Sequence, residues 1–374
     1  YEWYNPLYKA NLEKYVDALL HEANPPKIEG SIRAIIVPHA GYIFSGPVAA
    51  YAYRSLKGRD IKTVILLGNS HVDSFNGISI YIEGSFETPL GRIEIDTALA
   101  QKILSADPKI MDRPAAHERD HILEVQLPFL QRTLKDFKIV PIVFGSDDPR
   151  LTEILAKVLR EYLDSKTLVI ASTDMSHYPP YADAVAADHR TLDAILTAEP
   201  KSLDEALKAL AGENIPNAQT FLCGISGVRT TLILARKLGF NNPVLLKYAN
   251  SGDNPAGDRS RVVGYSAIVF TEPEEKTTEG ASEEKSLLSK AERNELLGIA
   301  RATVENFVRA SKIPEFPTVS QSLRQPLGAF VTLKENGQLR GCIGRFEASE
   351  PLYKIVQQMA VSAATEDPRF KPVD

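Results

Sequence analysis

Four short apolar runs, rich in β-branched residues, constrain the fold of the first two thirds of the chain more than any other feature. Each run is almost continuously hydrophobic, as expected for a strand covered on both faces. The runs are Arg33–Val37, Thr63–Leu67, Ile139–Phe144 and Thr167–Ala171. Helix-length segments alternate with them: Pro47–Leu56, Thr97–Ser105, His121–Leu134, Leu151–Leu163 and Ala182–Thr197. This alternation predicts a three-layer α/β domain, in which a mainly parallel sheet carries helices on both faces.

The rest of this region is expected to complete the sheet. Ile78–Asp96 has the pattern of short strands joined by turns, either an insertion or an antiparallel extension. An apolar helix that runs to Leu238 is predicted to begin near Cys223. Val244–Ala249 and Arg261–Phe270 are expected to be the last two strands.

An acidic stretch, residues 272–286, then divides the chain. Its sequence, EPEEKTTEGASEEKS, has six acids, two lysines and no aromatic residue, a net charge of −4. Because it cannot bury enough apolar surface to become ordered, we expect a flexible linker. It separates a first domain, residues 1–271, from a second domain, residues 287–374.

The second domain has a mixed pattern. Ser289–Arg309 is an amphipathic helix in which Ser289 is a plausible N-cap and Glu292 takes the capping-box position. Two strands, Leu327–Leu333 and Gly341–Phe346, and a helix near Glu350–Ala364 should follow. Since the chain stops without an obvious terminating element, we expect a small α+β domain that is cut short.

Composition excludes several classes of protein. The net charge of −5 argues against a nucleic-acid binder that neutralises phosphates. No apolar run approaches the ~20 residues that span a bilayer, so no membrane segment is expected. The two cysteines, Cys223 and Cys342, lie in different predicted domains and form no disulfide framework, which favours the reducing cytoplasm.

Three of the seven histidines follow a predicted strand within six residues. His39 follows the first run, His71 the second and His177 the fourth. Ligands of open α/β sheets bind outside the carboxyl ends of the strands. Three imidazoles at one such edge indicate a metal or acid–base site, whereas the alternative is three structural, hydrogen-bonded histidines.

Cys223 is a fourth candidate ligand. It stands near the predicted start of a helix, where the pKa of a thiol is lowered and the metal-binding thiolate is favoured. The alternative is a cysteine buried in the core.

Five sequence blocks carry a resemblance to a known family. They are PHAGYIFSGPVAAYAY, LLGNSH, HILEVQLPFLQ, STDMSHY and CGISGV, in this order. Together they resemble the signature blocks of the Memo family and cover most of residues 1–271. That family resembles class III extradiol dioxygenases, which hold non-haem Fe(II) with two histidines and one carboxylate. A three-layer α/β domain with a metal site is what this resemblance implies.

The resemblance also implies roles for individual residues. His39 and His71 match the family's two metal-site histidines, and Cys223 matches its metal-site cysteine. His177 matches the position of an acid–base histidine, with Asp174 as its orienting neighbour. Cys223 replaces the dioxygenase carboxylate with a softer thiolate, which shifts preference toward Cu(I), Fe(II) or Zn. Fe(II) is the expected metal, with Cu or Zn as alternatives.

The string His117-Glu118-Arg119-Asp120-His121 matches the zinc-protease motif H-E-x-x-H literally. That motif needs both histidines on one helix, but Asp120 is well placed as the N-cap of a helix that begins at His121. A protease is therefore not expected. His121 is instead expected to support catalysis from behind the ligands, or simply to cover the edge of the sheet.

In the second domain, PLGAFV and LRGCIG resemble the hallmark of the AMMECR domain, and the resemblance covers about half of such a domain. Arg340 could bind an anion and Cys342 could be a nucleophile. The alternative is a structural turn with a buried thiol. Because prokaryotic members of both families are commonly associated with a radical-SAM protein, the resemblance implies such a partner.

Together these features predict a metal-dependent redox or ring-chemistry enzyme acting on a small-molecule substrate, an oxidoreductase similar to extradiol dioxygenases. The alternative is a metal-binding scaffold without turnover that serves a radical-SAM partner.

Overall fold

The computed structural model describes residues 11–272, 288, 290–335, 338–345, 350–367 and 370–373. Its contacts divide the chain into a first unit, Tyr1–Glu275, and a second unit, Lys276–Asp374. Most of the predicted linker, residues 273–286, lies outside the described residues, as does the predicted cap Ser289. Glu272, which we had placed in the linker, ends a strand and forms a salt bridge of 2.9 Å with Arg33.

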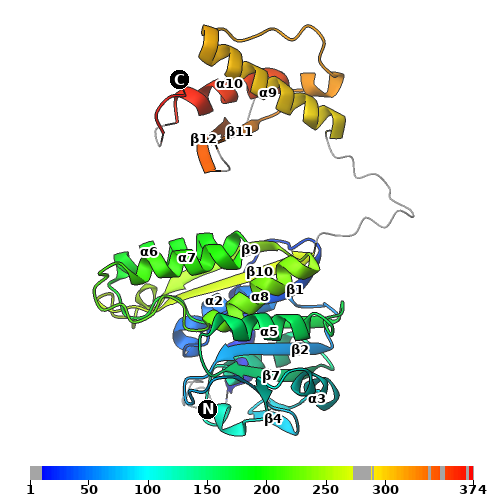
Figure 1. The fold of residues 1–374 in the computed structure, drawn as a ribbon, viewed down its shortest axis with the longest axis vertical. Helices are drawn as coiled ribbons and strands as arrows, with labels where there is room; N and C mark the ends of the chain where they lie inside the picture. Colours follow the sequence, from blue (N-terminus) through cyan, green and yellow to red (C-terminus); the bar gives the residue numbers. More distant parts are fainter. Residues whose placement is uncertain are drawn as a thin grey trace, which may run out of the picture. The chain divides into compact units, whose positions relative to one another are not determined.

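The first unit is built on an eight-stranded sheet with the order β6-β3-β7-β2-β8-β1-β10-β9 (Figure 1). The four neighbours β7, β2, β8 and β1 run parallel, while β10, β9 and β3 are added antiparallel. The bounds are β1 Ser31–Val37, β2 Thr63–Asn69, β3 Ile78–Ile80, β6 Ile110–Met111, β7 Lys138–Phe144, β8 Thr167–Ser172, β9 Asn242–Asn250 and β10 Gly264–Glu272. The predicted mainly parallel α/β sheet is confirmed.

Helices cover both faces of this sheet. Successive residues of β2 point to opposite faces of the sheet. Leu67 packs against Gly227 of α8 on one face, whereas a Cβ added to Gly68 would meet Ile122 on the other. One face carries α8 (Ile225–Leu238), packed against α5 (Pro149–Leu159) and α7 (Pro200–Ala211). The other carries α2 (Tyr42–Ser55), which contacts α1 (Leu12–Glu22) and α4 (Leu127–Thr133). Helices α3 (Thr97–Ala106) and α6 (Tyr181–Leu196) and the hairpin β4 (Ser85–Thr88)–β5 (Gly91–Glu94) complete the unit.

Helix α2 begins five residues before the predicted start at Pro47. Proline has no N–H, so the carbonyl oxygen of Ile43, one turn earlier, loses its helical partner. Asn254 donates its side-chain amide to that oxygen at 2.8 Å. A residue far along the chain thereby allows the helix to extend back to Tyr42, close to His39.

The segment predicted as a helix from His121 is different. A 3-10 turn occupies Glu124–Gln126, and α4 starts only at Leu127, with Pro128 in the first turn, where proline is tolerated. His121 therefore lies on a loop rather than on a helix.

The second unit contains α9 (Lys290–Ala310), a 3-10 turn at Gln321–Arg324, β11 (Ala329–Glu335), β12 (Gln338–Arg345) and α10 (Leu352–Thr365). The two strands pair antiparallel. Its apolar core is separate from that of the first unit and includes Ile299, Leu323, Val331, Val356 and Ala360. The predicted smaller α+β region is confirmed.

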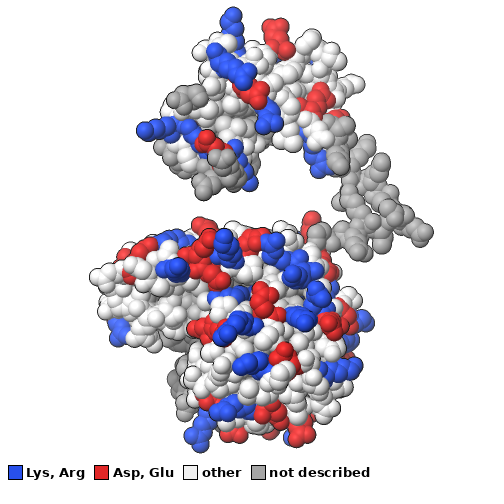
Figure 2. Space-filling model, in the orientation of Figure 1, with Lys and Arg blue, Asp and Glu red and all other residues white. Residues whose placement is uncertain are grey.

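Basic and acidic side chains are mixed over the face of the first unit drawn in Figure 2. Among the described residues, exposed charges form ion pairs such as Lys166 with Asp60 and Arg190 with Glu213, each at 2.8 Å. Such pairs contribute little to stability. Of the helices that the structure describes, none has the length and apolar character to cross a membrane.

Candidate metal centre

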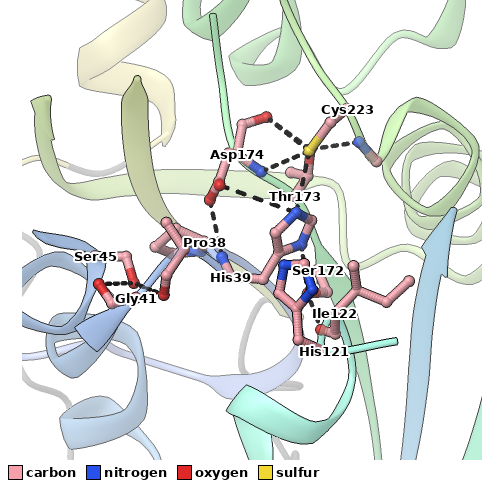
Figure 3. Close-up of polar contacts among 12 residues, drawn as sticks. Pro38, His39, Gly41, Ser45, His121, Ile122, Ser172, Thr173, Asp174 and Cys223 are labelled. Atoms are coloured by element: carbon pink, nitrogen blue, oxygen red, sulfur yellow. Dashed lines mark hydrogen bonds and ion pairs between the residues drawn. The ribbon is translucent and has the colours of Figure 1, made fainter. Parts of the chain in front are cut away.

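The candidate site lies at the carboxyl ends of β2, β8 and β1, which are adjacent in the sheet. His39 comes two residues after β1, His71 two residues after β2, and Asp174 two residues after β8. Parallel strands end at the same edge, so these side chains meet although they are far apart in the sequence. Figure 3 shows His39 between Cys223 and Asp174 on one side and His121 on the other.

Three histidines, His39, His71 and His121, form the core of the site. Their ligand atoms all lie within 4.8 Å of one another. His39 is buried, His121 is intermediate and His71 is exposed. Among the described residues no second group of three metal-ligating side chains is this close. Sequence reasoning placed His121 behind the ligands and Cys223 among them, but the structure brings His121 into the histidine group.

Asp120 holds two of these histidines in place. Its Oδ2 accepts a hydrogen bond from the backbone N–H of His71 at 2.7 Å, and its Oδ1 accepts one from Ile122 at 3.2 Å. Asp120 therefore joins the loop after β2 to the loop that carries His121. It caps this turn rather than a helix that begins at His121.

His117 does not join the site. Arg119 has a φ of 61°, which turns the chain between His117 and His121 and prevents a continuous helix. The Nε2 of His117 lies 3.0 Å from Ser79 Oγ, and burial lowers the pKa of its imidazole to about 4. The zinc-protease arrangement is therefore absent from the part of the chain described here.

Buried polar partners orient His39. Its Nδ1 lies 3.0 Å from Ser172 Oγ, and its backbone N–H donates to Asp174 Oδ1 at 2.8 Å. Gln126 in turn donates to Ser172 Oγ at 2.9 Å. Burial, followed by the charges of the other histidines, keeps the pKa of His39 well below its usual value, so His39 is a neutral imidazole at pH 7.

Cys223 lies directly against this imidazole. Its Sγ is 3.2 Å from His39 Nε2 and accepts the backbone N–H of Asp174 at 3.2 Å. Burial, with a smaller effect from the charge of Asp174, raises the pKa of the thiol to about 12. The expected lowering at a helix start is therefore wrong for the metal-free chain, because desolvation outweighs the helix dipole.

Two glycines let α8 approach the site. A Cβ on Gly224 would overlap with the carbonyl oxygen of Ser172, and one on Gly227 would lie 3.3 Å from Leu67. The close approach brings Cys223, one residue before Gly224, to the end of β8. This explains the spacing of the CGISG block.

Asp174 is buried, and burial raises the pKa of its carboxyl group to about 7, partly offset by hydrogen bonds from the backbones of His39 and Ala40. Its Oδ2 lies 3.9 Å from His39 Nε2. Asp174 was expected to orient His177, but the structure pairs it with His39.

His177 faces the same cluster. Burial, and to a smaller extent the charge of His71, lowers the pKa of His177 to about 4. Its backbone N–H donates to Thr220 at 2.9 Å, which fixes the loop. The Nε2 atom of His177 is buried and has no hydrogen-bond partner among the described residues. A buried polar atom without a partner is costly.

Asp188 supports this loop and was missed by the sequence reasoning. It accepts hydrogen bonds from the backbone of Ser176 and from the hydroxyl of Tyr248, both at 2.8 Å. A Cβ on Gly264 would overlap with its carboxyl group. A charged residue inside an otherwise apolar helix face, as Asp188 is in α6, was the available signal.

In the second unit, Arg340 contacts the carbonyl oxygen of Pro372 at 3.3 Å, and the backbone N–H of Cys342 donates to Asp367 at 2.8 Å. A Cβ on Gly341 would overlap with the carbonyl of Ala363 in α10. The glycine of the LRGCIG block therefore serves the packing of β12 against α10.

Two family models match different parts of this chain. A family model described as Memo-like protein matches residues 2–269, and the AMMECR1 family model matches residues 297–374. A MEMO1 family protein of Sulfurisphaera tokodaii is 38% identical over 252 residues, 66% of this chain and 85% of that protein. A MEMO1 family protein of Methanopyrus kandleri is 36% identical over 245 residues, 64% of this chain and 83% of that protein.

Two solved structures are also similar. An uncharacterized protein from Pyrococcus horikoshii is 30% identical, with a TM-score of 0.23, over 24% of this chain and 46% of that chain. An uncharacterized protein from Escherichia coli K12 is 11% identical, with a TM-score of 0.42, over 64% of this chain and 99% of that chain.

Proposed function

This chain belongs to the Memo-like protein family, and on that premise we propose that its first unit is a metal-dependent enzyme that acts on a small molecule. The observation that carries the proposal is the convergence of His39, His71 and His121, whose ligand atoms lie within 4.8 Å of one another at the sheet edge. A bound metal ion would account for the close approach of three imidazoles, because neutral imidazole is the commonest metal ligand in proteins.

The donor set fits a divalent transition metal. Metal-binding imidazoles must be neutral, and burial lowers the pKa values of His39 and His121 below the physiological range. The 3.2 Å between His39 Nε2 and Cys223 Sγ suits two ligands of one ion, given bonds of ~2.1 and ~2.3 Å. A bound cation would also deprotonate the thiol, which burial alone keeps neutral. Nitrogen and sulfur donors favour Fe(II), with Cu or Zn as alternatives.

The site is arranged for turnover as well as for binding. His71 is exposed, so a small molecule can reach the cluster, whereas structural metal sites are closed. His177 is neutral at pH 7, since its pKa is lowered to about 4, and it can accept a proton from a substrate hydroxyl at its unpaired Nε2. When bound, iron would supply the redox step, as in extradiol-type ring cleavage.

Metal analysis after anaerobic purification tests the proposal. His39→Ala and His71→Ala should lose the metal, because each removes a ligand, whereas His177→Ala should keep it. With catechol as the probe, loss of the proton acceptor should slow dioxygen uptake about 10²–10⁴-fold. His21→Ala is the matched control, because its imidazole is exposed in the last turn of α1. If the wild type holds no metal, the proposal fails.

A metal-binding scaffold is the alternative. It predicts metal bound by the wild type, no dioxygen uptake and no effect of His177→Ala. We also propose that the protein has a radical-SAM partner and acts on a substrate of low mass. We propose that it works in the reducing cytoplasm. In keeping with such a compartment, Cys223 and Cys342 form no disulfide within the described part of the chain.

A further inference from the structure

Gln126 has a fixed amide orientation. Its side-chain N–H group donates to the carbonyl oxygen of Pro38 at 3.0 Å, and a carbonyl cannot donate in return. Its Oε1 accepts the hydroxyl proton of Tyr53 at 2.7 Å. The second N–H of the amide therefore points to Ser172 Oγ, at 2.9 Å, and Ser172 must accept it.

The hydroxyl proton of Ser172 is also assigned. Ser172 Oγ lies 2.6 Å from the carbonyl oxygen of Ile122, a distance that requires a hydrogen between the two oxygens. Because the hydroxyl has one proton, it can donate to no other group. Its remaining lone pair faces His39 Nδ1 at 3.0 Å, so Nδ1 must carry a proton to make this bond.

The opposite tautomer would leave two lone pairs facing each other in a buried place. Ser172 is fully buried and His39 is 2% exposed, so water does not relieve the conflict. An unsatisfied buried group of this kind destabilises the folded protein. The network therefore selects one tautomer of His39.

From this network we infer that Ser172, held by Gln126, is a positioning residue that fixes His39 as the Nδ1–H tautomer and thereby makes Nε2 the metal-binding nitrogen. The inference rests on the proposed metal centre. It agrees with the position of Cys223, whose Sγ approaches His39 on the Nε2 side. The same hydroxyl binds the carbonyl of Ile122, next to His121, so Ser172 ties two of the three histidines together (Figure 3).

Nitrogen-15 NMR of the metal-free protein, labelled at histidine, tests the tautomer directly. We expect the wild-type spectrum to show a protonated Nδ1 and an unprotonated Nε2 for His39. The His39→Gln variant assigns the signals. A protonated Nε2 in the wild type would overturn the inference, and this result does not depend on whether the Ser172 variants fold.

Zn(II) titration provides the second measurement. Ser172→Ala should weaken Zn(II) binding about 10–100-fold, as loss of a ligand-orienting partner typically does, and should allow both tautomers. Ser172→Thr keeps the hydroxyl and should restore the Nδ1–H tautomer. Ser266→Ala is the control, since Ser266 is equally buried but contacts Met175. Unchanged tautomer and affinity in Ser172→Ala would overturn the inference.

The two proposals fail in different ways. If the wild type binds no Zn(II), Fe(II) or Cu(I), the metal centre is wrong, while the NMR result still decides the tautomer. If the metal binds but the tautomer is unaffected by Ser172, only the positioning role is wrong.

Discussion

The Sγ atom of Cys223 lies 3.2 Å from the Nε2 atom of His39, although the two residues are 184 positions apart in the sequence. Without metal the thiol is neutral, because burial raises its pKa to about 12. The thiol therefore donates to the imidazole. In the proposed metal centre, the sulfur of Cys223 would favour soft metal ions more than a group of histidines alone would.

Replacement of Cys223 should therefore change metal preference. We expect Cys223→Ser to reduce affinity for Cu(I) by a larger factor than affinity for Zn(II), because thiolate prefers soft ions. Competition titrations with chelators of known affinity measure both factors. His121→Ala is the comparison, since it removes a nitrogen donor, which is intermediate between hard and soft ligands. Equal losses for both ions in Cys223→Ser would contradict a role for sulfur in binding.

Asp120 is predicted to strengthen metal binding without being a ligand itself. Asp120→Ala removes the acceptor that holds the backbone of His71 and the turn at Ile122. Metal affinity should fall about 10–100-fold while the fold persists. Asp112→Ala, an exposed aspartate nearby in the sequence, serves as the control. Circular dichroism and isothermal titration with Zn(II) report fold and affinity separately, and wild-type affinity in Asp120→Ala would refute the role.

Gly264 is predicted to be intolerant of any side chain. In Gly264→Ala the new Cβ would overlap with Asp188, which supports the loop of His177. Overpacking of this kind costs typically 1–3 kcal/mol. Urea unfolding should show this loss, whereas Gly212→Ala should be close to neutral, since its nearest atom is 3.4 Å away. Similar stability of the two variants would mean that the contact relaxes freely.

His117 should give the protein a specific sensitivity to acid. Burial lowers the pKa of His117 from 6.5 to about 4. Between these values the unfolded chain binds a proton that the folded chain does not, so the free energy of unfolding falls as the pH drops. The slope reaches about 1.4 kcal/mol per pH unit. His117→Gln removes this group only, so the stability difference between wild type and variant should shrink from pH 6.5 toward pH 4. Parallel pH profiles would contradict the buried, neutral state.

Much of the fold follows from local pattern. The four continuous apolar runs predict the four central strands, because only strands covered on both faces lack alternation. The same strands predict His39, His71 and His177 at one edge, since parallel strands end together. These features depend on residues close to each other in the sequence.

The parts that sequence reasoning missed depend on distant contacts. The early start of α2 requires Asn254, 211 residues from Ile43, to satisfy a carbonyl that Pro47 cannot. The entry of His121 into the cluster requires the turn at Arg119 and the bonds of Asp120 to the loop of His71. The raised pKa of Cys223 follows from burial, which a position near a helix start does not reveal.

Anomalous diffraction from crystals grown anaerobically with Fe(II) tests the metal centre most directly. Data collected at the iron absorption edge should show one strong peak at the sheet edge, within ~2.1 Å of nitrogen atoms of His39 and His71 and within bonding distance of His121, of Cys223 or of both. For His39 the bonded atom should be Nε2. A peak elsewhere, or no peak in crystals that contain stoichiometric iron, would contradict the account.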